Sequence, residues 1–313
     1  MMSDERRCCV MCGPPAVSEH LFRKGAYAIL RCRLCGLIFA SPHPTHDELE
    51  QIYSESFFQV GEKFAGQAGS SGRLNAEHRV RRLLTTPGVI RGNWLDVGCA
   101  TGDFMLAARP HVGHIAGVEM SMYAAEQTRA KGLQDVVVGD FLRASLGNDP
   151  VDIVTMWDVI EHVPDPLAFL RHAFQLLRNG GLIALSTGDI GSLVARVMGR
   201  FWHLMIPPRH LYFFSPVTIR NLLSQAGFEA VVVSKPGKRV PLDFALWKLA
   251  SLVTPRAGSA ALRLGALTHL GRLAPFVNLW DIMTIVARKR PLGMTPSPED
   301  VSTHQYDSLV NRS

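Results

Sequence analysis

The chain has 313 residues, 47% of them hydrophobic, and this composition excludes a mainly disordered protein. Its formal net charge is +6, with 33 Lys and Arg against 27 Asp and Glu. The excess is concentrated in residues 191–290, where 14 basic residues face 3 acidic ones, a net charge of +11. The charge therefore argues against a uniformly basic nucleic-acid-binding protein and indicates one basic region with a partner of its own.

The amino terminus and the apolar segments bear on localisation. The first residues, MMSDERRCCVMCGPP, carry charges without an apolar run behind them, so a signal peptide is not indicated. No stretch offers the roughly 18 uninterrupted apolar residues that a membrane-spanning helix needs. The six cysteines are too sparse for a disulfide scaffold. We therefore predict a reduced, cytoplasmic location.

Four cysteines form two CxxC pairs, each followed by a glycine: Cys9 with Cys12, and Cys32 with Cys35. Two such pairs complete a tetrahedral sulfur site for zinc. Residues 1–45 are therefore predicted to be a zinc ribbon with a structural metal, because four cysteine ligands leave no open position. The segment HLFRKGAYAILRC is predicted to be one strand leading into the second pair. The alternatives are coincidental pairs or a redox dithiol, and Cys8 could replace Cys9 at a poorer spacing.

Residues 46–75 are predicted to be a linker between the ribbon and the main domain. A short helix is expected from Asp47 to Tyr53, and the Gly/Ser stretch at 66–72 is expected to be flexible. A basic helix from Asn75 to Leu84 precedes the main domain.

Residues 76–290 alternate strand and helix patterns, which predicts an α/β fold with a doubly wound parallel sheet. Seven strands are expected, at Asn93–Val97, Ile115–Glu119, Val136–Val138, Ile153–Met156, Leu182–Ser186, Phe228–Ser234 and Ile282–Ala287. Helices are expected at Asp103–Arg109, Met122–Lys131, Pro166–Leu177 and Ser215–Ala226.

The first strand runs into a turn rich in small residues, Asp96-Val97-Gly98-Cys99-Ala100-Thr101-Gly102-Asp103-Phe104. Such a turn lets the backbone approach a ligand at the start of a helix. Its Gly-x-Ala-x-Gly spacing differs from that of pyrophosphate-binding turns, and the lack of a following Gly-Lys-Ser/Thr excludes an ATP-type phosphate loop. Asp96 would repel a diphosphate and suits a ligand that bears an ammonium group.

Acidic residues follow the next three strands. Glu119 ends the second strand, where a carboxylate can accept hydrogen bonds from both hydroxyls of a ribose. Asp140 and Phe141 follow the third strand, in positions suited to the amino group and the ring face of an adenine. The fourth strand leads into Met156-Trp157-Asp158-Val159-Ile160-Glu161-His162-Val163-Pro164. Each acid alone could be a helix cap or a surface charge, but acids at successive strand ends point to one crevice.

These motifs resemble those of the class I S-adenosylmethionine-dependent methyltransferases. LDVGCATGDF, GVEMS, GDF, DIVTMWDVIEHVPDP and LLRNGGLIALST match in order and spacing over about residues 75–235. The resemblance implies a seven-stranded Rossmann-like sheet with a reversed final hairpin. It also implies that S-adenosylmethionine is held by Asp96, Gly98, Ala100, Gly102, Phe104, Glu119, Met120, Asp140, Phe141, Trp157 and Asp158. Ala100 stands where many members of the family carry glycine.

A closer likeness is to the subgroup that includes ubiquinone-pathway O-methyltransferases. These proteins share the EHVxDP turn and a later motif, here His210-Leu211-Tyr212-Phe213-Phe214-Ser215. The leading ribbon resembles that of bacterial methyltransferases in glycan and secondary-metabolite pathways. Sugar C-methyltransferases with a zinc ribbon share the layout, but their later motifs are not evident here.

Methyl transfer from a sulfonium centre depends on orientation, and on a base where the acceptor is a hydroxyl. The candidate catalytic residues are His162, His210 and Tyr212. His162 could instead cap the following helix, Tyr212 could be a packing aromatic, and Asp158 could position the cofactor or act in acid–base catalysis. The string FWHLMIPPRHLYFFS around His210 is predicted to form a lid over the acceptor.

Residues 240–277 are predicted to be a helical insertion, with basic amphipathic helices at Leu242–Leu252 and Ala260–Ala274. Such helices can lie on an anionic membrane surface or hold an acidic substrate, and they equally often cover a core or form a homodimer interface. Peripheral membrane contact through residues 191–277 is therefore one expectation. Residues 291–313 are predicted to be a disordered tail.

The leading hypothesis is S-adenosylmethionine-dependent methyl transfer to a small-molecule, sugar-linked or lipid-linked acceptor, with transfer to oxygen favoured. The alternatives are a non-catalytic binding protein that keeps the cofactor fold, and a methyltransferase that acts on RNA or protein. Residues 1–75 are net neutral, so a nucleic-acid partner is not expected.

Overall fold

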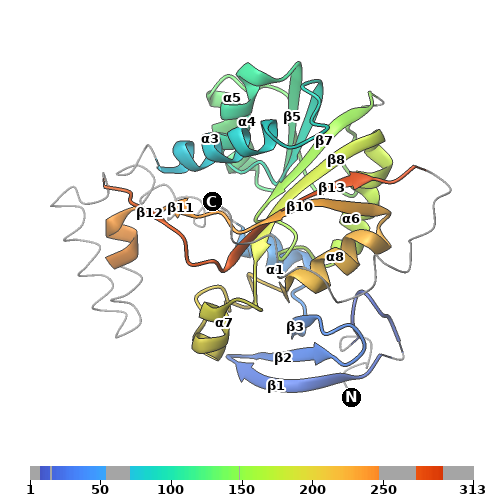
Figure 1. Cartoon of the computed structure of the whole chain (residues 1–313), viewed down its shortest axis with the longest axis vertical. Helices are drawn as coiled ribbons and strands as arrows, with labels where there is room; N and C mark the ends of the chain where they lie inside the picture. Colours follow the sequence, from blue (N-terminus) through green and yellow to red (C-terminus); the bar gives the residue numbers. More distant parts are fainter. Residues whose placement is uncertain (1–7, 15, 54–70, 148, 247–272, 292–313) are drawn as a thin grey trace.

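The computed structural model describes residues 8–14, 16–53, 71–147, 149–246 and 273–291. Its central sheet has seven strands in the order β10-β13-β8-β7-β4-β5-β6 (Figure 1). The strands are β4 (Asn93–Val97), β5 (His114–Glu119), β6 (Val136–Val138), β7 (Val151–Trp157), β8 (Leu177–Gly188), β10 (Phe228–Ser234) and β13 (Ile282–Lys289).

The strand pairing confirms the predicted α/β fold and the reversed final hairpin. Strands β4 to β8 pair in parallel, whereas β13 runs antiparallel to both of its neighbours, β8 and β10. All seven predicted strands are present. Strands β4, β6 and β10 match their predicted bounds, β5, β7 and β13 extend one or two residues further at one or both ends, and β8 begins five residues earlier than predicted. The carboxyl ends of the parallel strands therefore meet at one edge, as the order of the motifs requires.

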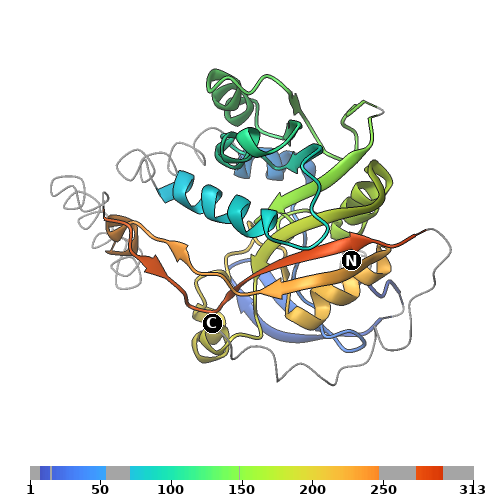
Figure 2. The ribbon, with the colours of Figure 1, turned by 45° about the horizontal axis from the view of Figure 1, so that its top comes forward.

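Helices cover both faces of this sheet, and Figure 2 shows α3 and α8 on opposite sides of it. One face carries α3 (Ser71–Leu84), α4 (Asp103–Ala108) and α5 (Met122–Ala130), and the other carries α6 (Pro166–Leu176) and α8 (Pro216–Gln225). Alternation along β4 serves both cores, since Trp94 packs with α3 and α4 while Leu95 packs with the opposite cluster.

Local capping fixes where several helices begin. The Asp165 carboxylate accepts a hydrogen bond from the Ala168 amide at the start of α6, and Pro166 occupies the first turn, where a missing N–H costs nothing. Ser215 and Thr218 form a capping box at the start of α8.

The ribbon sheet differs from its prediction. HLFRKGAYAILRC is a hairpin of two strands, β1 (Ser18–Lys24) and β2 (Tyr27–Cys32), and not a single strand. Gly25, at a φ of +59°, allows the reversal between them. Strand β3 (Ile38–Ser41) pairs with β2, and a fourth strand, β9 (Tyr212–Phe213), pairs with β3 from the far end of the chain.

The segment between β8 and α8 is also different from its prediction. It holds α7 (Leu193–Met198), a 3-10 turn η3 (Gly199–Phe201) and β9. The predicted lid is wrong, because Trp202, Met205 and Phe213 are buried against the ribbon sheet and no residue of this segment lines either cavity described below. The segment instead packs the ribbon onto the main domain, with the ribbon sheet and α7 together at the bottom of Figure 1.

The predicted linker is partly regular. Helix α1 (His46–Ile52) begins at a capping box of Thr45 and Glu48, and α3 begins at Ser71, inside the stretch expected to be flexible. A short two-stranded ladder of β11 (Lys238–Arg239) and β12 (Phe276–Val277) closes the base of the predicted insertion. A helix begins at residue 242, whereas the rest of that helix, most of the second predicted helix and nearly all of the predicted tail lie outside the described residues.

The helices within the described residues bear on whether the chain crosses a membrane. None of the helices there has both the length and the apolar character needed to cross a bilayer.

Candidate active site

A cavity of about 410 Å³ lies at the carboxyl ends of β4, β5, β6 and β7, and we refer to it as the smaller cavity. Eight of the predicted cofactor residues line it: Gly98, Ala100, Glu119, Met120, Asp140, Phe141, Trp157 and Asp158. Asp96 and Phe104 instead line a larger neighbouring cavity, and Gly102 lines neither. The predicted cofactor residues are thus distributed over two adjoining cavities, which share Gly98, Ala100, Trp157 and Asp158.

Glu119 braces the turn that follows β4. Its Oε2 accepts a hydrogen bond from the Ala100 amide at 2.8 Å, and its Oε1 accepts one from the Ser121 amide at 2.9 Å. Burial raises the pKa of Glu119, although the backbone N–H groups oppose that shift. Each carboxylate oxygen keeps a second lone pair that can accept a hydrogen bond from a ligand.

The small residues of the turn have distinct roles. Ala100 adopts a φ of +48°, a left-handed conformation that favours glycine, which explains why many family members carry glycine there. Gly102 has a φ of +80°, and a Cβ at this position would lie 2.6 Å from Thr128 Cγ2. Gly102 is therefore required for packing against α5.

Asp140 and Phe141 close the far end of the smaller cavity. Asp140 Oδ1 accepts a hydrogen bond from the Leu142 amide at 3.1 Å. The Phe141 ring packs against Phe169, with ring centroids 5.4 Å apart, and against His172 at 4.7 Å. Phe141 is consequently held rigidly by the core, and Asp140 lines the cavity with its Oδ2 3.9 Å from Arg143 Nε.

Asp158 lies on the wall between the two cavities, with a left-handed φ of +57°. Its carboxylate forms an ion pair with Arg79 of α3 and accepts a hydrogen bond from the Ser186 hydroxyl at 2.8 Å. Burial alone would raise the pKa of Asp158, but the positive charges of Arg79 and Lys238 and the Ser186 hydroxyl hold it well below its usual value. Asp158 is thus a carboxylate at neutral pH, and Arg79 is a site residue that the sequence motifs did not reveal.

His162 is the one predicted catalytic residue that lines the smaller cavity. Its Nδ1 lies 2.8 Å from the Arg209 carbonyl oxygen and 2.7 Å from the Tyr53 hydroxyl. A carbonyl oxygen only accepts hydrogen bonds, so Nδ1 carries the hydrogen and Nε2 keeps the free lone pair of a neutral imidazole. Burial lowers the pKa of His162, which favours this neutral form. His162 does not cap α6, since Asp165 does.

The other two candidate catalytic residues lie behind His162. The His210 ring packs edge-on against the His162 ring, with centroids 4.6 Å apart, and it lines neither cavity. The buried Tyr212 hydroxyl donates a hydrogen bond to the Pro164 carbonyl at 2.7 Å, and burial raises the pKa of Tyr212 above its usual range. Tyr212 is thus a packing aromatic, whereas Tyr53, from the predicted linker, contacts His162 directly.

Glu161, His162 and His210 bring three donor atoms within 4.8 Å of one another. Burial, reinforced by the Asp158 carboxylate, raises the pKa of Glu161 to about 8, and its Oε2 has no hydrogen-bond partner. A cation with nitrogen and oxygen ligands could be held by this cluster.

The four cysteines of the ribbon fit a zinc ion. Their sulfur atoms all lie within 4.8 Å of one another, and the Sγ atoms of Cys9 and Cys35 are 3.5 Å apart. Four ligands at about 2.3 Å from a tetrahedral zinc would be roughly 3.8 Å apart. Gly13 and Gly36 have left-handed φ values and donate hydrogen bonds back to the carbonyls of Cys9 and Cys32, as the predicted turns require.

The donor set of the smaller cavity fits S-adenosylmethionine. Glu119 and Asp140 offer carboxylate oxygens to hydroxyl and amino groups, and Asp158 offers a negative charge. A volume of about 410 Å³ falls within the range of small-molecule sites.

Comparisons with known proteins agree with this geometry. A methyltransferase-domain family model matches residues 71–233, more than half of the chain. The chain is similar to proteins named ubiquinone biosynthesis O-methyltransferase. One, from Marinobacter nauticus, is 28% identical over 149 residues, which cover 43% of this chain and 63% of that protein. Another, from Yersinia pestis, is 25% identical over 177 residues, which cover 54% of this chain and 73% of that protein.

Two solved structures show the same fold. A SAM-dependent methyltransferase from Thermotoga maritima matches with a TM-score of 0.53 and 21% identity, over 77% of this chain and all of that one. The magnesium protoporphyrin IX methyltransferase of Synechocystis PCC 6803 matches with a TM-score of 0.51 and 14% identity, over 78% of this chain and all of that one. With its motifs, its sheet order and the family match in agreement, the chain belongs to the methyltransferase-domain family of class I fold.

Proposed function

We propose that this protein transfers the methyl group of S-adenosylmethionine to a hydroxyl group of an organic acceptor. The carrying observation is that a neutral His162 lines the same cavity as Glu119 and Asp140. The relatives named as O-methyltransferases support transfer to oxygen.

Glu119 would hold the ribose hydroxyls and Asp140 the adenine amino group, because both carboxylates face the cavity with free lone pairs. Asp158, whose charge is already paired with Arg79, would line the site beside the ligand. S-adenosylmethionine supplies, when bound, a methyl group on a sulfonium centre.

His162 acts as the general base in this proposal. Its Nδ1 hydrogen is held by the Arg209 carbonyl, so Nε2 is available to accept the proton of the acceptor hydroxyl. Tyr53 and His210 are positioning residues, since they fix the imidazole from two sides. The zinc ion proposed for the ribbon is structural, because its four cysteine ligands leave no open position.

We also propose that the acceptor is linked to a sugar or a lipid, and that the protein contacts a membrane surface. A sugar-linked or lipid-linked acceptor agrees with an exposed apolar stripe on α7 and η3, where Leu193, Val197 and Phe201 are 77%, 79% and 67% exposed. Arg196 and Arg200 lie in the same segment, so it suits an anionic membrane surface at the cytoplasmic side. Flotation with vesicles containing phosphatidylglycerol should recover the protein, and the triple substitution of the stripe by serine should abolish recovery; equal recovery would contradict the contact.

Calorimetry with S-adenosylmethionine tests the proposed function. The intact chain should bind one equivalent, and Glu119→Gln should weaken binding at least tenfold, because the new amide would set a donor against one of the two backbone N–H groups. Glu126→Gln, exposed on α5, is the matched control and should bind normally. Lack of binding by the intact chain would reject the proposal. Tight binding without methylation of any hydroxylated acceptor would favour a non-catalytic binding protein. Methylation of RNA or protein would favour the alternative of a macromolecule-directed methyltransferase.

A further inference from the structure

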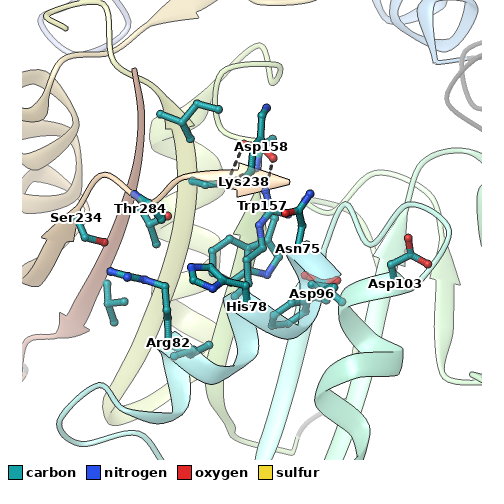
Figure 3. A pocket seen from close by; sticks show the side chains of 18 of the residues that line it. Asn75, His78, Arg82, Asp96, Asp103, Trp157, Asp158, Ser234, Lys238 and Thr284 are labelled. Carbon is teal, nitrogen blue, oxygen red and sulfur yellow. Dashed lines mark hydrogen bonds and ion pairs between the residues drawn. The ribbon is translucent and has the colours of Figure 1, made fainter. Parts of the chain in front are cut away.

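A second cavity, of about 620 Å³, adjoins the smaller one, and we refer to it as the larger cavity. The two share Gly98, Ala100, Trp157 and Asp158 in their linings. The remaining walls of the larger cavity come from α3, from the ends of β8 and β10, from β11 and from the start of β13 (Figure 3). It therefore opens onto the wall where the proposed methyl transfer takes place.

The acidic residues of the larger cavity are already balanced. Asp158 is paired with Arg79, and Asp103 accepts a hydrogen bond from Lys131 at 2.9 Å. Burial raises the pKa of Asp96 to about 7, so this group carries only part of a charge at neutral pH.

The basic residues of the larger cavity are not balanced in the same way. Within the part of the chain that the structure describes, neither the Arg82 guanidinium nor the Lys238 ammonium has a carboxylate within ion-pair distance. The larger cavity therefore carries a surplus of positive charge, which is opposite in sign to the carboxylates of the smaller cavity.

Two buried nitrogen atoms of residues that line this cavity have no hydrogen-bond partner among the described residues. They are Nε2 of His78 and Nε1 of Trp157, and both side chains point into the cavity, from α3 and β7 (Figure 3). Burial, together with Arg82 and Arg81, lowers the pKa of His78 and so keeps its imidazole neutral. Native proteins seldom leave buried polar atoms unpaired, so these two atoms indicate a ligand with hydrogen-bonding groups.

The rest of the lining combines apolar side chains with uncharged polar ones. Leu83, Phe104, Val232, Ile282 and Val286 are among the apolar residues, and Asn75, Ser186, Ser234 and Thr284 are among the polar ones. Arg82 follows Arg79 by three residues on α3, which is about 4.5 Å along the helix axis. In Figure 3, Arg82 lies toward the end of the cavity that holds Ser234 and Thr284, and Asp158 lies toward the other end. A ligand could therefore reach from the shared wall to Arg82 and contact both apolar and polar side chains on the way.

We propose that the larger cavity binds the methyl acceptor, and that this acceptor is an amphipathic organic anion whose carboxylate or phosphate group pairs with Arg82. The inference rests on the proposed function and adds to it the chemical class of the acceptor. The apolar body lies along α3 and the hairpin of β10 and β13, and the hydroxyl group reaches past the shared Trp157 and Asp158 wall to the smaller cavity, which His162 lines. Lys238 adds to the positive potential.

Calorimetry on the full-length, zinc-loaded chain with three naphthalene probes tests this inference. The probes are 2-naphthoate, 2-naphthyl phosphate and the neutral 2-naphthol, each titrated with S-adenosylhomocysteine present. We expect at least one of the two anions to bind at least tenfold more tightly than 2-naphthol, and the preferred anion identifies carboxylate or phosphate. Arg82→Gln should remove that preference without changing the affinity for 2-naphthol.

Arg81→Gln is the matched control, since Arg81 is the preceding exposed residue of α3 and does not line the cavity. It should leave the affinity for the anions unchanged. Equal binding of anions and 2-naphthol, or equal losses in the Arg81 and Arg82 variants, would overturn the inference. Separate titration with S-adenosylhomocysteine alone distinguishes the two proposals: failure there rejects the proposed function, whereas normal binding without an Arg82-dependent preference for anions rejects only the inference.

Discussion

The two adjoining cavities are built in different ways. The smaller cavity is formed largely by the ends of consecutive strands, β4 to β7, and its carboxylates Glu119, Asp140 and Asp158 each come from a recognisable motif. The larger cavity combines α3 with β10, β11 and β13, which are up to about 200 residues away in the sequence, and its unbalanced charges are positive. If the proposals above hold, local motifs encode the cofactor chemistry, whereas tertiary assembly encodes the choice of acceptor.

The largest expected effect is on folding, and it comes from changing the zinc ligands of the ribbon. The ribbon packs directly beneath the smaller cavity. Cys32 and Phe39 belong to the same buried cluster as Phe141 and Phe169, which line the smaller cavity. Cys9→Ser should remove the zinc, destabilise the ribbon sheet with β9, and leave mostly insoluble protein, since metal binding supplies much of the folding free energy of such a domain. Zinc analysis and thermal unfolding measure both effects.

Cys8→Ser serves as the control for that experiment. Cys8 lies outside the four-sulfur cluster, so this variant should retain one zinc per chain and its unfolding temperature. A Cys9→Ser protein that is folded and soluble without metal would contradict a structural role for zinc.

The next effect is on kcat, and it compares His162, which lines the smaller cavity, with Tyr212, which does not. His162→Gln should lower kcat by about 10² to 10⁴, the usual contribution of a general base, while leaving the affinity for S-adenosylmethionine unchanged. Release of S-adenosylhomocysteine, with an acceptor found by screening hydroxylated aromatic acids, provides the assay. Tyr212→Phe is the comparison, because Tyr212 lines neither cavity and its hydroxyl donates a hydrogen bond to the backbone carbonyl of Pro164. If Tyr212→Phe lowered kcat as much as His162→Gln, the assignment of the base would be wrong.

A smaller effect is on the pH dependence of stability, and it concerns Asp96 in the lining of the larger cavity. Buried Asp96 accepts a hydrogen bond from the Thr155 hydroxyl at 2.6 Å, and burial raises its pKa to about 7. The folded state therefore holds this proton more tightly than the unfolded state, and the resulting stability is lost as pH rises through about 7. Asp96→Asn cannot ionise, so its unfolding temperature relative to the parent should rise by several degrees between pH 4 and pH 8.

Scanning calorimetry without cofactor measures that difference. Asp103→Asn is the control, because Asp103 is substantially exposed and paired with Lys131. It should show no comparable rise. Parallel curves for Asp96→Asn and the parent protein would mean that Asp96 is ionised throughout this range.

The sequence predicted the elements whose signals are local. Strand runs, capping residues such as Asp165 and Ser215, and glycines after the cysteine pairs each impose a conformation on their own neighbours. The ribbon hairpin was missed because its turn is marked only by Gly25 between two apolar runs. The lid was wrongly predicted because an apolar string reads alike whether it covers a ligand or packs against another domain.

Tyr53, Arg79 and Arg82 show the limit of motif-based prediction at the site. Tyr53 reaches His162 from 109 residues away, and Arg79 reaches Asp158 from 79 residues away. Neither contact has a local pattern, since such pairs depend on where the helices dock. Only the net positive charge of residues 191–290 indicated an anionic partner, and it did not identify α3 as a contributor.

By itself, the sequence determined the sheet, the cofactor turn and the four-sulfur cluster, because hydrophobic periodicity, backbone freedom and ligand spacing act within a few residues. Tertiary structure alone decided which predicted residues share a cavity. Asp96 and Glu119 line different cavities, whereas Tyr53 forms a hydrogen bond with His162 in the smaller one. It also decided the pKa of each acid, because burial and neighbouring charges exist only once distant elements have packed together.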